Sequence, residues 1–393
     1  MRRSRRRWSV CPLVILLSSL GIACEPRGEE GVGQAGSVGG TGEEAAQLSG
    51  AVTGTEEGTG TQPDLSGISV VPERWVSAWD TTSNLDSPAY WSNGEDRWVI
   101  ATAKGTHDLW VFDASTGGFL RRVGGEGTAL GDFEYPNGIA VLGDLLFVVE
   151  RDNHRVQLLR LPEFDPVGVF GGSILLRPYG IALFGDPAGE MNVYVTDDYG
   201  NEEDPPEGQD PAGDFTHRVS HFQVWVGEAG LETELVRQFG EEEGPGALMV
   251  VESIQVDEVH GNVLVADEHN LELELYGLDG SYKRETVGSD LYRFGDPEGL
   301  VLYRCGDEGY WILTDQGETR TVFHILDRAS FGYLGSFAGV ITANTDGIWL
   351  TQDSIPNLGM GALFALNDDG GLAAFAWEDV AEAQHLREGC SGG

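Results

Sequence analysis

The sequence predicts an all-β fold, a six-bladed β-propeller, on the strength of three observations. Short apolar runs alternate with turns through residues 66–393, and glycine is abundant at 57 residues. One arrangement of strands and turns recurs six times at about 40–50 residues per copy, which is typical of four-stranded propeller blades. The 3.6-residue period of amphipathic helices is nearly absent. A β-sandwich is the main alternative, but it would not require six copies of one motif.

The first 24 residues are expected to be a lipoprotein-type signal peptide. Five arginines precede an apolar stretch that is too short for a transmembrane helix, a pattern typical of secretory signals. The stretch ends in "LGIAC", which resembles a bacterial lipobox and makes Cys24 the candidate for lipidation. Gly21 and Ala23 also fit ordinary signal cleavage, so both routes stay open. Either route predicts export to the bacterial cell envelope, where the protein is lipid-anchored, periplasmic or secreted.

Two segments lack the apolar residues of a packed fold. Residues 25–65 are rich in Gly, Glu, Ser and Thr, which predicts a flexible linker between the membrane and the propeller. Residues 200–214 form an acidic insertion with several prolines and glycines, which we expect to be a solvated loop. The predicted domains are therefore a signal peptide at 1–24, a linker at 25–65 and a propeller at 66–393.

The six repeats share one order of elements. Their starting residues are Ser87, Tyr135, Arg177, Val250, Asp296 and Asn344. In each repeat a turn residue and a small or acidic residue lead into an apolar strand. A second strand, a third strand that is often aromatic, and a fourth strand follow, with polar turns between them. Because the first strands of propeller blades line the channel, the acids at their starts are expected to meet at one mouth.

The formal net charge of −40 argues against a nucleic-acid groove, because phosphate binding normally needs an excess of Lys and Arg. Solubility outside the cell explains many of the acids. Carboxylates that converge also repel one another unless protons or divalent cations neutralise them. Oxygen ligands favour Ca²⁺ or Mg²⁺ over zinc or copper. The candidate ligands are Asp86, Glu252, Asp267, Glu268, Asp296, Glu298 and Asp346.

Two cations stand at one position of neighbouring repeats, directly after the second strand. Lys104 in "ATAKG" and Arg151 in "VERDN" are the candidates for holding a negatively charged substrate. Each could instead be an ordinary surface salt-bridge partner.

Two of the four cysteines remain for the folded domain, since Cys11 lies in the signal peptide and Cys24 is the lipidation candidate. Cys305 and Cys390 are then a possible disulfide in an oxidising compartment. Two unrelated buried thiols are the alternative.

Several segments, in order along residues 68–377, resemble the β-propeller phytases. They are "DSPA" from Asp86, "ATAKG", "VERDN", "YGIAL" from Tyr179, "VESIQ" with Glu252, "DPEGLVLY" from Asp296 and "NTDGIWLTQ" from Asn344. The resemblance implies a calcium-dependent phosphatase that hydrolyses phytate or a related phosphate ester with a metal-activated water. It implies several calcium ions at the ligands named above, with catalytic roles for Glu252, Glu298 and Asp346. It also implies that Lys104, Arg151 and Tyr179 bind phosphate.

Three positions depart from the family pattern. Ser87 and Asn344 replace acids, and Thr196-Asp197-Asp198 stands where the family has a further phosphate-binding lysine. The number of calcium ions and the substrate range are therefore open.

The alternative function is non-catalytic. The second repeat, from Tyr135, resembles an NHL repeat, and an NHL-like propeller lipoprotein would bind a protein or glycan partner. A monomer is expected under either interpretation, because a closed propeller leaves little sheet edge to pair.

Overall fold

The computed structural model describes residues 65–199, 216–228, 230–241, 243–287 and 290–390. The predicted signal peptide, Cys24, the linker up to residue 64 and the acidic insertion at 200–214 lie outside these residues. Within them, no helix has both the length and the apolar character needed to cross a membrane.

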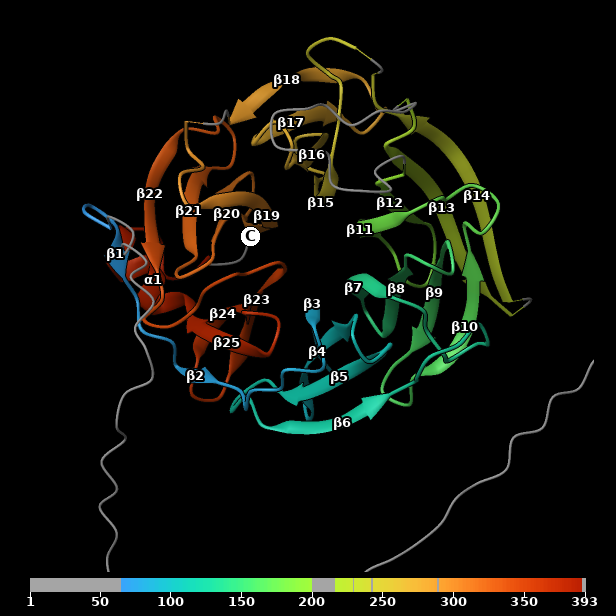
Figure 1. Cartoon of the computed structure of the whole chain (residues 1–393), viewed down its shortest axis with the longest axis horizontal. Helices are drawn as coiled ribbons and strands as arrows, with labels where there is room; N and C mark the ends of the chain where they lie inside the picture. Colours follow the sequence, from blue (N-terminus) through green and yellow to red (C-terminus); the bar gives the residue numbers. More distant parts are fainter. Residues whose placement is uncertain (1–64, 200–215, 229, 242, 288–289, 391–393) are drawn as a thin grey trace, which may run out of the picture. The chain divides into compact units, whose positions relative to one another are not determined.

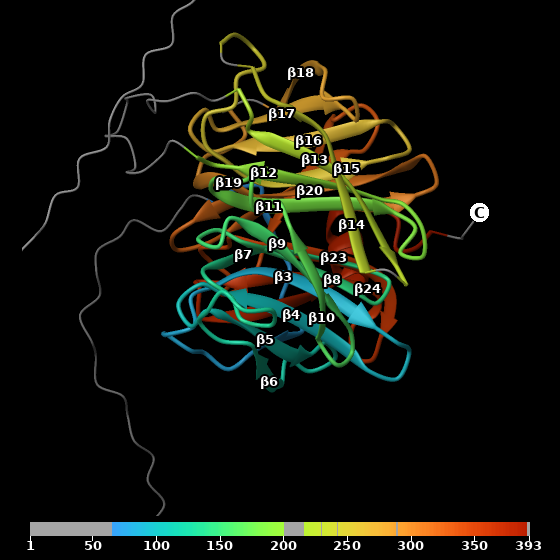
Figure 2. The ribbon, with the colours of Figure 1, turned by 90° about the vertical axis from the view of Figure 1, so that its right-hand side faces the viewer.

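Six sheets, antiparallel except for one short parallel strand pair, surround a central channel, which confirms the predicted six-bladed β-propeller (Figure 1). The strands of each blade run in chain order from the axis outward. The first blade contains β3 (Leu85–Ser92), β4 (Arg97–Ala103), β5 (Asp108–Asp113) and β6 (Phe119–Val123). The second contains β7 (Pro136–Leu142), β8 (Leu145–Glu150), β9 (Arg155–Arg160) and β10 (Asp165–Phe170). The third, which faces the viewer in Figure 2, contains β11 (Pro178–Gly185), β12 (Met191–Asp197), β13 (Val219–Gly227) and β14 (Gly230–Phe239).

The remaining three blades repeat this order. The fourth contains β15 (Val251–Asp257), β16 (Asn262–Asp267), β17 (Glu272–Gly277) and β18 (Tyr282–Val287). The fifth contains β19 (Gly295–Cys305), β20 (Glu308–Gly317), β21 (Val322–Asp327) and β22 (Tyr333–Ala338). The sixth takes β23 (Ile348–Ile355), β24 (Gly359–Asn367) and β25 (Gly371–Ala376) from its own repeat.

The ring is closed by strands from before the first blade. β2 (Trp75–Val76) pairs antiparallel with β25 and supplies the fourth strand of the sixth blade. β1 (Ser69–Val70) pairs parallel with β22 and adds a fifth strand to the fifth blade. The repeat pattern predicts a fourth strand within every repeat, and the sixth blade differs because β2, from before the first repeat, takes that place. The short helix α1 (Trp377–Gln384) after β25 was not predicted either.

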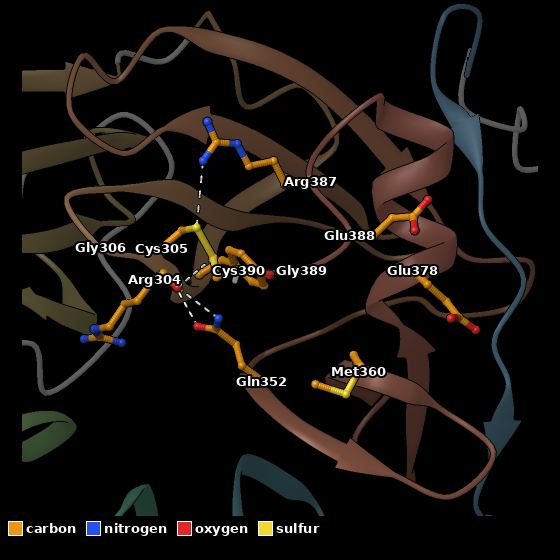
Figure 3. A pocket seen from close by; sticks show the side chains of 11 residues that line it. Arg304, Cys305, Gly306, Gln352, Met360, Glu378, Arg387, Glu388, Gly389 and Cys390 are labelled. Atoms are coloured by element: carbon orange, nitrogen blue, oxygen red, sulfur yellow. Dashed lines mark hydrogen bonds between the residues drawn. A yellow bond between two sulfur atoms is a disulfide. The ribbon is translucent and has the colours of Figure 1, made fainter. Parts of the chain in front are cut away.

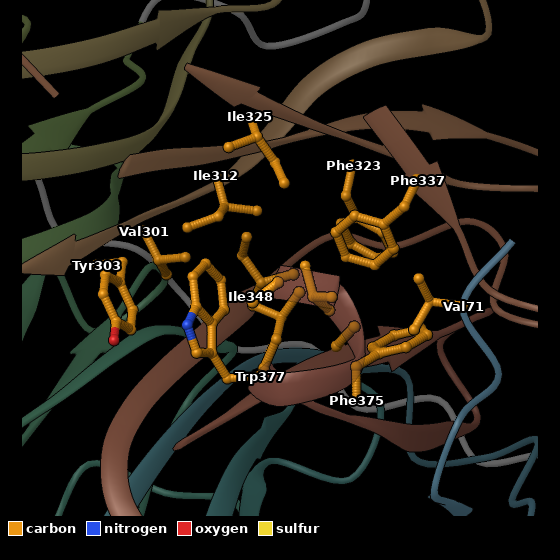
Figure 4. Close-up of a cluster of buried hydrophobic side chains, with 14 of the residues drawn as sticks. Val71, Val301, Tyr303, Ile312, Phe323, Ile325, Phe337, Ile348, Phe375 and Trp377 are labelled. Atoms are coloured by element: carbon orange, nitrogen blue, oxygen red, sulfur yellow. The ribbon is translucent and has the colours of Figure 1, made fainter. Parts of the chain in front are cut away.

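The hydrophobic cores lie between neighbouring blades. Between the fifth and sixth blades, Val301 and Ile312 pack in one buried cluster with Ile348 and Phe375 (Figure 4). Trp377 of α1 is fully buried in the same cluster and stacks on Tyr303, with ring centroids 4.2 Å apart. Burial of both faces explains why strands such as β8, whose six residues are all buried, are almost continuously apolar.

A disulfide joins the end of β19 to the C-terminal tail. Cys305 and Cys390, with Cα atoms 5.4 Å apart, are the two bonded cysteines (Figure 3). A pocket of about 1020 Å³ lies beside this bond and is lined partly by Arg304, Gln352 and Glu378. Cys305 is the last residue of β19, so this pocket lies at the opposite end of that strand from the predicted ligand Glu298.

A buried ion pair links the fourth and fifth blades. The guanidinium of Arg328, just after β21, donates two hydrogen bonds to Asp257 at the end of β15, at 2.9 and 2.6 Å. Both side chains are completely buried. Burial alone would raise the pKa of Asp257, but hydrogen bonds from Arg328 and His260 outweigh that effect and lower it. The pair therefore depends on both partners being charged.

We expect Asp257→Asn to lower the free energy of unfolding by about 3–5 kcal/mol, because it leaves a buried guanidinium without its counter-charge. Denaturant unfolding of the purified chain measures this change. The matched control is Glu308→Gln, which removes a pair with Arg387 whose two side chains are 61% and 56% exposed. Its effect should stay below about 1 kcal/mol. Equal losses in the two variants would contradict the structural role of the buried pair.

Candidate metal centre at the channel mouth

Five blades carry the same β-bulge at the start of the first strand. In each bulge the first strand advances by three residues where the paired second strand advances by two. In the first blade, for example, Leu85 pairs with Ala103 and Pro88 pairs with Ala101. The first unpaired residue of the bulge, taking the first to the fifth blade in order, is Asp86, Asn137, Tyr179, Glu252 and Glu298. Bulges redirect side chains at the rims of sheets. Asp86, Tyr179, Glu252 and Glu298 interact with one another at the mouth of the channel, and Asp346 of the sixth blade, two residues before β23, joins them.

Contacts between blades fix the backbone at these positions. The amide of Gly347 donates to the carbonyl oxygen of Asp86 at 2.9 Å, and a Cβ at Gly347 would lie 2.6 Å from that oxygen. Thr196 of the third blade donates through its hydroxyl to the carbonyl oxygen of Glu252 at 2.8 Å. The channel-facing residues are therefore positioned by their neighbouring blades as well as by their own strands.

The first group of site residues surrounds an ammonium ion. Lys104 Nζ lies 2.7 Å from Asp86 Oδ1 and 3.5 Å from Asp346 Oδ2. It also lies 3.4 Å from the hydroxyl of Tyr179, which donates to Asp86 at 3.2 Å. Gln316 donates to the other oxygen of Asp346 at 2.5 Å. Burial opposes the charge of Lys104, but Asp86 and Asp346 outweigh it and raise its pKa well above the usual value.

The second group consists of three glutamates. One carboxylate oxygen from each of Glu252, Glu268 and Glu298 lies within 4.8 Å of the other two. They come from three separate places, namely the start of β15, the residue after β16 and the start of β19. Three carboxylates at this spacing match the oxygen ligands that a hard divalent cation requires.

Crowding and burial make these carboxyl groups weak acids. Burial, opposed by Lys104 and assisted by Asp86, raises the pKa of Glu252 to about 7. Burial and the charges of Glu252 and Glu298 raise the pKa of Glu268 well above its usual value. Burial and repulsion from Glu252 and Asp346 do the same for Glu298. In the metal-free protein the cluster therefore retains protons well above the pH at which isolated carboxyl groups ionise.

Asp267, a predicted metal ligand, has a structural role instead. Its carboxylate is completely buried and accepts backbone amides of Met249 and Val250 at 2.9 and 3.3 Å. Asp197 and Asp315 bind the loops of their own blades in the same way. The prediction included both Asp267 and Glu268, and only the glutamate joins the cluster: Asp267 ends β16 with its carboxylate bound to loop amides, whereas Glu268 lies in the turn beyond the strand.

Two other predicted residues lie outside these two groups. Asp296 is exposed by its surface area, but the groups packed around its carboxyl partly desolvate it. This desolvation and the charge of Asp315 raise the pKa of Asp296, and the charge of Asp296 acts on Glu268. In the second blade, Arg151 occupies the position that Lys104 has in the first. Its guanidinium, however, donates two hydrogen bonds to the carboxylate of Asp152, at 2.6 and 3.1 Å. It also stacks over Tyr135, 3.4 Å from the ring centroid.

Two further residues, Gln316 beside Asp346 and Asn137 at the bulge of the second blade, were not predicted from the sequence. Asn137 is fully buried at the bulge of the second blade. Neither the oxygen nor the nitrogen of its side-chain amide has a hydrogen-bond partner among the described residues. A shared signal marks its position, since Pro-x-Gly recurs at residues 136–138, 178–180 and 297–299, with the bulge residue in the middle.

The chain is thus a six-bladed propeller with an acidic cluster and one lysine at its channel mouth. No family model and no curated protein matches it. Among solved structures, a chain from a crystal structure of a nidogen/laminin complex is similar, with 14% sequence identity and a TM-score of 0.43. The match covers 67% of this chain and 82% of that chain. No functional assignment follows from a likeness of this size.

We expect the raised pKa values to make the metal-free protein less stable as the pH rises. A carboxyl group whose pKa is higher in the folded than in the unfolded state favours folding at low pH, and this contribution disappears as the pH passes the folded value. For Glu252 the window lies between the usual 4.5 and about 7. In chelator, Glu268→Gln should therefore become more stable than the wild type by on the order of 1–3 kcal/mol between about pH 5 and about pH 8.

Denaturant unfolding at each pH measures the difference between the two proteins. Glu308→Gln is the control, because Glu308 is exposed at the other end of the fifth blade. A constant difference between wild type and Glu268→Gln across the pH range would show that the three glutamates do not repel one another in solution.

Proposed function

We propose that the chain is a calcium-dependent phosphomonoester hydrolase of the β-propeller phytase type, acting on phytate or a related phosphate ester. The observation that carries the proposal is the convergence of Glu252, Glu268 and Glu298 within 4.8 Å. Lys104 and Tyr179 lie at the same mouth of the channel. An anionic substrate and a hard cation would therefore meet at one place.

The residues fit calcium by their chemistry. Glu252, Glu268 and Glu298 would hold it, since they offer oxygen atoms alone and carry mutual repulsion that a divalent cation relieves. Asp86 and Asp346, which both form ion pairs with Lys104, offer further carboxylate oxygens at the same mouth. When bound, calcium supplies a Lewis acid for the phosphate oxygens and lowers the pKa of a coordinated water.

The chain's own residues would hold the ester. Lys104 Nζ and the hydroxyl of Tyr179 are donors at the mouth, and the ammonium suits a phosphate oxygen as a point charge. Arg151 would bind a phosphate group only if its guanidinium exchanged the two hydrogen bonds to Asp152 for hydrogen bonds to the substrate. Glu298 and Asp346, with pKa values raised chiefly by burial, are candidates to receive the proton of the attacking water.

The departures from the family pattern change the charge of the site in both directions. Asp198 occupies the position of Lys104 in the third blade; it lies 3.6 Å from Arg218 and accepts the amide of Val251. Ser87 donates its hydroxyl to Asp86 at 2.9 Å, where the family has a second acid. The third blade therefore offers one cation fewer for phosphate, whereas Ser87 removes a negative charge beside Asp86.

We expect the purified chain to release phosphate from phytate and from a simple monoester only when calcium is added. Glu298→Gln should lower kcat by about 100-fold or more, and its unfolding transition in chelator should show no loss of stability relative to the wild type. Glu308→Gln, on the far end of the same blade, should keep wild-type activity. Phosphate assay and thermal unfolding with and without calcium provide the measurements.

No release at any calcium concentration, together with no calcium-linked rise in melting temperature, would contradict the enzyme and leave the NHL-like binding protein as the explanation. Full activity in Glu298→Gln would contradict the assignment of the site.

A further inference from the structure

The acidic cluster contains two groups of carboxylates that are neutralised in different ways. Asp86 and Asp346 both form ion pairs with Lys104, at 2.7 and 3.5 Å. In the part of the chain that the structure describes, Glu252, Glu268 and Glu298 form no ion pair with a side chain. The first group therefore contains a cation in direct contact, whereas Lys104 acts on Glu252 and Glu298 through its charge without an ion pair.

The surroundings of the Lys104 ammonium resemble those of a bound metal ion. Three oxygen atoms from three blades, on Asp86, Tyr179 and Asp346, lie between 2.7 and 3.5 Å from Nζ. The side chain is 11% exposed, so water screens these contacts little. The backbone is fixed as well, because the Lys104 amide donates to the carbonyl oxygen of Asn84 at 2.8 Å.

We propose that Lys104 is a built-in cation that occupies the second cation position of the cluster, between Asp86 and Asp346. The wild-type chain then binds one divalent cation, at Glu252, Glu268 and Glu298, and the second position is closed to metal. The inference deepens the proposed function by assigning the cation stoichiometry of its site. It differs from a simple phosphate-binding role, in which Lys104 would leave the number of bound cations unchanged.

Removing the ammonium tests the proposal, because it leaves Asp86, 1% exposed, beside Asp346 without a positive charge. A second divalent cation would relieve that repulsion. We expect calorimetric titration of the chelator-treated chain with calcium to give one site in the wild type and two in Lys104→Met. Lys104→Arg keeps the charge and should keep one site, and Lys104→Met with Asp86→Asn should return to one.

The matched control is Lys283→Met, since Lys283 bonds to Asn262 and the carbonyl oxygen of Gly261 on the fourth blade, away from the cluster. It should bind as the wild type does. If Lys104→Met does not fold, Lys104→Gln replaces it, because glutamine retains a polar group of similar length. Thermal unfolding with and without calcium provides a second measurement, and the extra site should add to the calcium-dependent shift in Tm.

An unchanged stoichiometry in both Lys104→Met and Lys104→Gln would overturn the proposal. Two sites in the wild type, one of them lost in Asp86→Asn, would overturn it too, as would the absence of any binding in all variants. Phosphate release is measured separately on the same samples. A gain of one site without phosphate release would support the built-in cation and contradict only the enzyme.

Discussion

Repulsion between carboxylates at the channel mouth is the constraint on which the rest of the site depends. Glu252, Glu268 and Glu298 are held within 4.8 Å of one another in partly buried surroundings, where like charges interact far more strongly than in water. The apolar packing between blades, such as the cluster around Trp377, provides the stability that offsets this repulsion. Closure of the ring by β2 also opposes this repulsion. It holds the first and sixth blades together, and these two blades supply Asp86 and Asp346.

The backbone is shaped for this purpose by one local device used five times. The bulge at the start of each first strand turns one side chain out of the pleat and toward the channel. Close contacts such as that between Gly347 and the Asp86 carbonyl then prevent the strand from relaxing. A rigid scaffold of this kind keeps acids in place that would otherwise move apart.

The sequence predicted the parts of this arrangement that depend on period and composition. Six repeats, apolar strands and acids at strand starts are visible in the chain itself, and they gave the blade number and residues such as Glu298. The sequence could not show which of Asp267 and Glu268 belongs to the cluster. The two residues are adjacent, and a difference of one position decides whether a carboxylate binds the loop or reaches the channel mouth. Strand exchange through β2 was also out of reach, since two residues that pair across the whole domain carry no local pattern. Asn137 was missed for a different reason: its type is neutral, and only its register assigns it to the channel.

The distribution of charge around the mouth also bears on how an acidic chain could attract an anion. The net charge of −40 describes the whole chain, whereas an approaching ligand meets the local field at the channel mouth. Lys104 cancels part of that field beside Asp86, and in our proposal a cation held by the three glutamates would cancel the remainder. Protons can take the place of that cation, as the pKa of about 7 for Glu252 indicates. Under the proposed cation binding, proton loss and cation uptake would be linked at this mouth, and both would set the field that an anion meets.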